Sequence, residues 1–166
     1  MGGDNSFTKL LYNWSKYNVL SGNGVLATRV RLGWVAPFGS SDAVPSKERF
    51  YLGGAYTIRG FSENDFGPHD ANGDPEGGES FGLVNLELRK PLFKLGWQIW
   101  GSYFIDSGLN VRQIRLLALR EIAVTTGIGT QIVSPVGPIR FDYGRRTTIN
   151  HYPAGGTFHF GILYAF

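Results

Sequence analysis

The chain has 166 residues, a formal net charge of +3 and no cysteine, and it is rich in glycine (24) and aromatic residues (12 Phe, 8 Tyr and 4 Trp). Its length suggests one domain, and the lack of cysteine excludes disulfides, cysteine-based metal sites and a cysteine nucleophile. The glycine and aromatic content favours a β protein with tight turns over a disordered chain, and no basic run indicates nucleic-acid binding.

Seven segments alternate between apolar and small or polar residues, as β-strands with two different faces do. In chain order they are FTKLLYNWSKYNVL (7–20), VLATRVRLGWVAPF (25–38), FGLVNLELRKPLF (81–93), GWQIWGSYFIDSG (96–108), AVTTGIGTQIVS (123–134), GPIRFDYGRRTT (137–148) and FHFGILYAF (158–166). The last is the clearest, with a bulky apolar face formed by Phe158, Phe160, Ile162, Tyr164 and Phe166.

The charged residues of these strands fall on the face opposite the aromatic one. In 137–148, Ile139, Phe141 and Tyr143 alternate with Arg140 and Asp142. An apolar outer face with a polar inner face is the arrangement of a transmembrane β-barrel, whose strands need only about 9–11 residues. A soluble β-sandwich or lipocalin-like barrel also alternates, with the faces reversed, and periodicity alone does not say which face is inside.

The connections alternate in length, which is typical of an outer-membrane barrel with short periplasmic turns and long extracellular loops. Residues 21–24, 93–96 and 134–138 are short turns, whereas 39–80, 107–122 and 145–157 are long. We therefore predict an antiparallel transmembrane β-barrel of seven or eight strands over residues 1–166, with 39–80 as a long extracellular loop.

The stretch RFYLGGAYTIRGF (49–61) within that loop has two interpretations. It alternates like an eighth inward-and-outward strand, and eight strands would close a small barrel. It also contains Gly53, Gly54 and Gly60, which would let a loop turn tightly and lie close to the barrel wall. From the residues alone, the two interpretations are equally supported.

Several motifs together resemble the BamA/TamA family of outer-membrane protein-assembly factors. They are ERFYLGGAYTIRGF with FGP (48–61, 66–68), LELRKPLF (86–93), YFIDSGLNV (103–111), SPVGPIRFDYG (134–144) and the aromatic C-terminal strand. The resemblance covers nearly the whole chain. It implies that 49–61 is a loop folded into the barrel lumen, with Arg59 meeting Glu87 and Asp106 on the inner wall.

The residues support this pairing independently, because Glu87 and Asp106 fall on the inner faces of adjacent predicted strands. A carboxylate confined in a lumen is costly unless it is paired, and arginine is its best bidentate partner. The signature strand of the family maps onto Gly137, Arg140, Asp142 and Gly144, with Asp142 pointing inward.

The chain also departs from the family pattern. Full members have a sixteen-stranded barrel preceded by periplasmic POTRA domains, whereas only seven strands and no POTRA-like segment are visible here. Seven strands cannot close alone, because an open edge is not tolerated in lipid. The chain is then part of a larger protein, closes with another chain, or uses 49–61 as an eighth strand.

The function implied by the resemblance is insertion and folding of other outer-membrane barrel proteins, without enzymatic chemistry. The C-terminal strand would act as an edge that templates client strands. The alternative is a small structural or pore-forming barrel. Expected partners are client outer-membrane proteins, membrane lipids, lipopolysaccharide and further copies of the chain, in a bacterial-type outer membrane.

No cofactor, metal or catalytic residue is expected. The acidic stretch DANGDPEGGE (70–79) has the oxygen spacing of a calcium loop but lacks the later bidentate Glu and a helical frame, which favours a solvated loop. His69, His151 and His159 have no nucleophile at a spacing that would pair with them.

Overall fold

The strands begin and end close to the predicted segments. The computed structural model describes residues 6–116, 118, 121–135, 137–147 and 152–162. Its elements are β1 (Phe7–Val19), η1 (Ser21–Asn23), β2 (Val25–Pro37), η2 (Ser46–Glu48), β3 (Ser80–Leu95), β4 (Trp97–Val111), η3 (Ile114–Leu116), β5 (Ala123–Ser134), β6 (Gly137–Arg146) and β7 (Gly155–Ile162). The three η elements are single turns of 3-10 helix.

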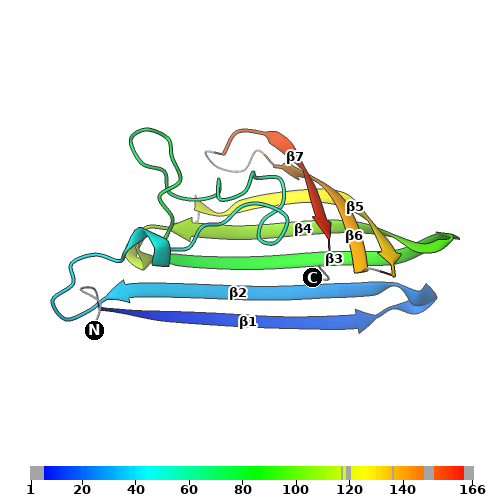
Figure 1. Ribbon diagram of the computed structural model, residues 1–166, viewed down its shortest axis with the longest axis horizontal. Coiled ribbons are helices and arrows are strands. Elements are labelled where there is room, and N and C mark those ends of the chain that lie inside the picture. The colour runs from blue at the N-terminus through cyan, green and yellow to red at the C-terminus, as the bar shows by residue number, and fades with distance from the viewer. Residues whose placement is uncertain (1–5, 117, 119–120, 136, 148–151, 163–166) are drawn as a thin grey trace.

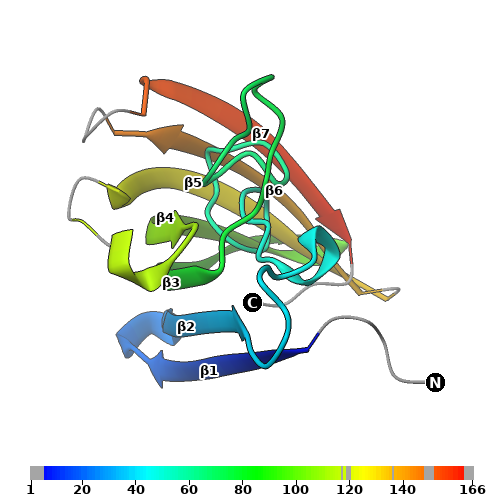
Figure 2. The ribbon, with the colours of Figure 1, turned by 90° about the vertical axis from the view of Figure 1, so that its left-hand side faces the viewer.

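The strands form one antiparallel sheet in chain order, β1 to β7, seven strands in the described part of the chain. Figure 2 shows that this sheet curls into a trough, with β1 and β7 as its two edges. The predicted all-β antiparallel barrel wall is confirmed, and over the described residues the wall does not close on itself. No helix in these residues is long and apolar enough to cross a membrane.

The outer, convex face of the trough is apolar and exposed. Along β3, for example, Val84, Leu86 and Leu88 are each about two-fifths exposed, while Asn85 and Glu87 between them are buried. A strand of a soluble protein would bury its aliphatic face and expose its charged one. The reversed order is the one that a lipid-facing wall requires.

The inner, concave face is covered by the long connection between β2 and β3. Figures 1 and 2 show this segment folded back over the sheet. Residues 49–61 contribute no strand to the sheet, since Phe50 and Leu52 form only isolated bridges, to Gly78 and Phe66 within the same connection. The interpretation of 49–61 as an eighth wall strand is therefore wrong.

The loop brings its own hydrophobic core into the trough. Buried side chains of the loop pack against inward residues of the wall: Val44, Phe50, Leu52, Ile58, Phe61 and Phe66 from the loop, with Val35, Phe81, Leu83 and Ala123 from the strands. Phe50 and Phe81 meet edge to face, with ring centroids 4.8 Å apart. Apolar burial thus fixes the loop at the end of the trough where the long loops lie.

Candidate functional site

Arg59 lies at the centre of the trough and binds two wall carboxylates. Its Nε and Nη2 donate to the two carboxylate oxygens of Asp106, each at 2.8 Å, and its Nη1 donates to Glu87 at 2.6 Å. The backbone N–H of Arg59 also donates to Asp106, at 3.1 Å. Both carboxylates are fully buried, so the bidentate geometry supplies the pairing that a buried charge needs.

Further charges complete this cluster. Arg140 Nη2 lies 3.1 Å from both Glu87 and Asp142, and Arg89 Nε donates to Glu87 at 2.6 Å. Asp142 lies 3.8 Å from Arg59. The buried network therefore contains three cations and three carboxylates whose charges cancel: Arg59, Arg89 and Arg140 with Glu87, Asp106 and Asp142.

The cluster holds Arg59 in its charged form. Burial by itself lowers the pKa of a guanidinium, but the hydrogen bond and charge of Asp106, with the charges of Glu87 and Asp142, outweigh it and raise the Arg59 pKa. An arginine guanidinium stays protonated in proteins in any case, so Arg59 remains a cation beside Asp106 and Glu87.

The guanidinium of Arg59 also stacks on an aromatic ring. The Arg59 Cζ lies 3.4 Å from the centroid of the Phe104 ring, a cation–π contact inside a water-poor site. Phe104 in turn lies over Gly127, its cross-strand partner, where a Cβ would come within 2.4 Å of the ring. Phe104 and Gly127 were not among the predicted site residues; the sequence places Phe104 two residues before Asp106, on the same face.

The residue after Arg59 contacts the last two strands by its backbone. The Gly60 N–H donates to Nε2 of His159 at 3.0 Å, and the Thr157 hydroxyl donates to the Gly60 carbonyl at 3.1 Å. Gly60 has φ +94° and lies against the backbone of Gly144 on β6, where a Cβ would sit 2.5 Å from the Gly60 nitrogen. The φ of Gly60 favours glycine at position 60, and the close approach of the two backbones favours glycine at position 144.

The residues before Arg59 contact the opposite side of the trough. The Tyr56 carbonyl accepts from Arg29 at 2.9 Å and from Arg31 at 2.7 Å, both on β2. The Thr57 carbonyl accepts from Asn85 on β3 at 2.8 Å. The five residues 56–60 thus form a strut that reaches β2, β3, β4, β6 and β7, and we call this segment the brace.

Gly53 and Gly54 shape the turn that begins the brace. Both have positive φ, +116° and +93°. The Gly53 N–H donates to the Thr57 hydroxyl at 2.8 Å, and that hydroxyl donates to the Gly53 carbonyl at 2.7 Å. These two predicted motif glycines therefore lie directly before the brace and set the direction in which the chain enters it.

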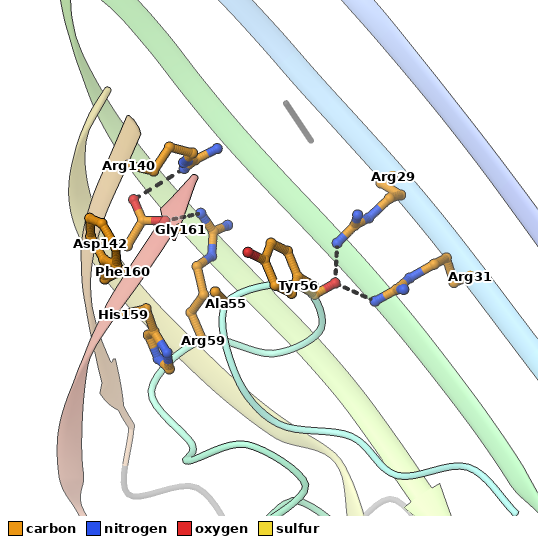
Figure 3. Close-up of a pocket in the computed structure, with 10 residues that line it drawn as sticks. All are labelled: Arg29, Arg31, Ala55, Tyr56, Arg59, Arg140, Asp142, His159, Phe160 and Gly161. Carbon is orange, nitrogen blue, oxygen red and sulfur yellow. Dashed lines mark hydrogen bonds and ion pairs between the residues drawn. The ribbon is translucent and has the colours of Figure 1, made fainter. Parts of the chain in front are cut away.

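A cavity of about 220 Å³ lies beside the brace. Figure 3 shows Arg29 and Arg31 reaching the Tyr56 carbonyl from one side, with Asp142 and His159 on the other. The cavity belongs to the lumen of the trough. No cluster of His, Asp or Glu in the described residues is arranged to hold a metal ion.

The remaining predicted site residues lie at one end and one edge of the sheet. Gly137 starts β6 with φ +117°, and the Ser134 hydroxyl donates to its carbonyl at 2.7 Å. Phe158, Phe160 and Ile162 point outward from β7 and are exposed. Tyr164 and Phe166 lie outside the described residues.

Asn110 is a second contact that the sequence reasoning missed. Its Nδ2 donates to the carbonyls of Phe50 and Phe66, at 3.1 and 3.0 Å, and so joins two parts of the loop to β4. The sequence feature that could have identified Asn110 is its position four residues after Asp106, which places both on the inner face of β4.

Comparisons with known proteins agree with this geometry. The Omp85 superfamily domain matches residues 1–166. The structure is similar to the crystal structure of BamA from Haemophilus ducreyi lacking POTRA domains 1–3, with a TM-score of 0.78 and 25% identity, over 96% of this chain and 35% of that one. The fold, the curled wall and the internal loop thus define part of the wall of an outer-membrane β-barrel. The chain belongs to the Omp85 superfamily.

Two relatives illustrate the range of the family. The chain is 36% identical over 146 residues to the outer membrane protein assembly factor BamA of Nitratidesulfovibrio vulgaris, covering 87% of this chain and 18% of that protein. It is also 36% identical over 150 residues to the sorting and assembly machinery component 50 homolog of Homo sapiens, covering 83% of this chain and 32% of that protein. The chain therefore spans less than a third of either relative.

Proposed function

We propose that this chain forms the C-terminal barrel wall of an outer-membrane protein assembly factor in a bacterial-type outer membrane. The superfamily match and the assembly-factor relatives support the proposal. The activity is the folding and insertion of client barrel proteins, and it involves no bond-making catalysis. Lipopolysaccharide and further copies of the chain are additional partners within this proposal.

The observation that carries the proposal is the position of β7. It pairs with β6 on one side, and like β1 it is an edge of the sheet over the described residues; it is also the edge that the brace holds, through His159 and Thr157. An edge strand presents unpaired backbone N–H and C=O groups, which a client strand can use by β-augmentation. The wall then continues from β7 into the client.

The brace keeps this edge in place. Gly60 is tied to His159 and Thr157 on β7, while Arg59, next to it in sequence, is tied to β3 and β4. A rigid edge strand binds a client strand more favourably than a mobile one, because no conformational entropy of the edge strand is lost on binding. In this proposal the Arg59 cluster supports the edge strand by holding the brace against β3 and β4.

The alternative of a small closed pore or structural barrel is less well supported. Such a barrel requires an eighth wall strand, and 49–61, the candidate for it, lies inside the trough. The loop and its ion cluster also fill space that a pore would leave open.

Site-specific cross-linking tests the templating proposal, and no cysteine within these 166 residues interferes with it. Phe158→Cys on β7 is placed in the complete gene product, together with single cysteines along the terminal strand of a client caught during assembly. We expect disulfides in one fixed register. Matched controls are Tyr103→Cys in the middle of the wall and Tyr12→Cys on β1. Equal cross-linking from all three positions would contradict templating at β7.

A further inference from the structure

The outer face of the wall has an apolar groove centred on a glycine. Four outward positions lie in one row across β1 to β4: Tyr12 pairs with Leu32, Leu32 with Gly82, and Gly82 with Leu109. Because Gly82 has no side chain, the row is interrupted there. The resulting groove has a volume of about 360 Å³.

The walls of this groove are hydrocarbon and aromatic. Leu32 and Leu109 flank Gly82, and Trp34 and Ile114 line the end nearer the long loops. The groove is continuous with the exposed aliphatic face of the sheet, which faces lipid in a membrane. Its shape and apolar lining suit a flexible acyl chain.

A cationic side chain stands at the loop end of the groove. A second hollow, of about 270 Å³, shares Trp34, Ser80 and Ile114 with the groove and also includes Arg115. Arg115 is exposed and pairs with no carboxylate in the described part of the chain, whereas Arg112 is bound to Glu76. The one carboxylate lining this hollow is Glu79, so the hollow carries one cation and one carboxylate.

We propose that the groove is a binding site for one anionic membrane lipid of the leaflet at the long-loop end. One acyl chain lies over Gly82 between Leu32 and Leu109, and the lipid phosphate is bound by Arg115. Trp34 lies near the loop end of β2, and at a membrane interface a tryptophan ring meets hydrocarbon while its N–H meets the headgroup region. The lipid would be retained at this position while the surrounding annular lipid exchanges.

The experiment uses the complete gene product in detergent, with phosphatidylglycerol as the probe and bound lipid counted by native mass spectrometry. We expect one retained phosphatidylglycerol that Gly82→Leu displaces by filling the groove. Gly82→Ala is the matched control, because its Cβ would meet Leu32 and Leu109 at ordinary contact distances of 3.5 and 3.9 Å. It tests whether a side chain at this position is tolerated, and we expect it to retain the lipid.

Arg115→Gln tests the headgroup contact separately. One surface cation contributes on the order of 1 kcal/mol toward an anionic lipid, so affinity should fall about fivefold. Preference over phosphatidylcholine with the same acyl chains should fall with it. Equal retention by wild type, Gly82→Leu and Arg115→Gln, or retention with no preference between the two lipids, would overturn the proposal. If Gly82→Leu does not fold, the Arg115→Gln result decides alone.

Discussion

Arg59 shows how a single residue can determine where a loop of more than forty residues lies. Its guanidinium satisfies two buried carboxylates on neighbouring strands and stacks on Phe104. Removing one partner of a buried ion pair lowers the free energy of unfolding strongly, because the other charge remains buried and unpaired. The loss is larger than the difference in stability between the intact pair and apolar residues of similar volume.

We predict that Arg59→Ala lowers the free energy of unfolding by about 3–5 kcal/mol, because Asp106 and Glu87 lose their shared cation. Urea titration of the protein in bilayers, followed by heat-modifiability on gels, measures the change. Lys9→Ala is the control, since its ion pair with Glu48 is partly exposed and should contribute less than about 1 kcal/mol. A variant as stable as this control would show that the cluster does not support the fold.

Gly144→Ala tests the contact between β6 and the brace. The added Cβ would lie 2.5 Å from the Gly60 nitrogen and 2.8 Å from the Arg59 carbonyl carbon, both backbone atoms that cannot rotate away. We expect a loss of roughly 1–3 kcal/mol by overpacking. Gly82→Ala on the outer face is the matched control and should be nearly neutral. Equal effects of the two substitutions on the urea midpoint would argue against a close approach of Gly60.

At the scale of elements, the strands could be predicted well and the loop only in part. In β3 and β6, outward apolar residues alternate with inward polar ones. This alternation predicts both the strand and the direction in which each side chain points, so the predicted and observed bounds nearly coincide. β7 starts at Gly155, three residues before the predicted start, because Gly155 and Gly156 pair with Arg146 and Arg145. Two glycines in succession show no alternation between apolar and polar residues, so the sequence does not indicate a strand there.

The alternation of 49–61 could not separate strand from loop. Phe50, Leu52 and Ile58 are apolar because they fill the trough, and a strand facing lipid would need the same residue types. The contacts of Phe104 with Gly127 and of Asn110 with the loop depend on cross-strand register, which the sequence pattern alone does not contain.

The junction between the brace and β7 makes an element-scale prediction. His159→Phe keeps a ring but removes the acceptor of the Gly60 N–H, and Thr157→Val removes the donor to its carbonyl. Each leaves a buried backbone group unsatisfied, at about 1–3 kcal/mol. We expect faster amide exchange across β7 with little change in β3 and β4, and partial restoration by His159→Gln. Unchanged exchange in β7 would show that the edge is not held by the loop.

At the scale of the whole molecule, the chain is a curled wall whose concave side is filled by its own loop. The apolar cluster anchors the loop at one end of the trough, and the neutral ion cluster fixes the brace across its middle. The outer face stays apolar for lipid while the inner face carries the charges. This division places the exposed leucines where a barrel wall faces lipid and the arginines where they are buried and paired.

Amide hydrogen exchange of residues 54–61 in the bilayer-embedded protein tests this account most directly. The Arg59 and Gly60 N–H groups donate to Asp106 and His159 inside the trough. We predict protection comparable with that of β3 and β4, lost in Arg59→Ala. Exchange as fast as that of the exposed loop tip at residues 70–74 would mean that the segment does not lie inside the wall, and the brace would be contradicted.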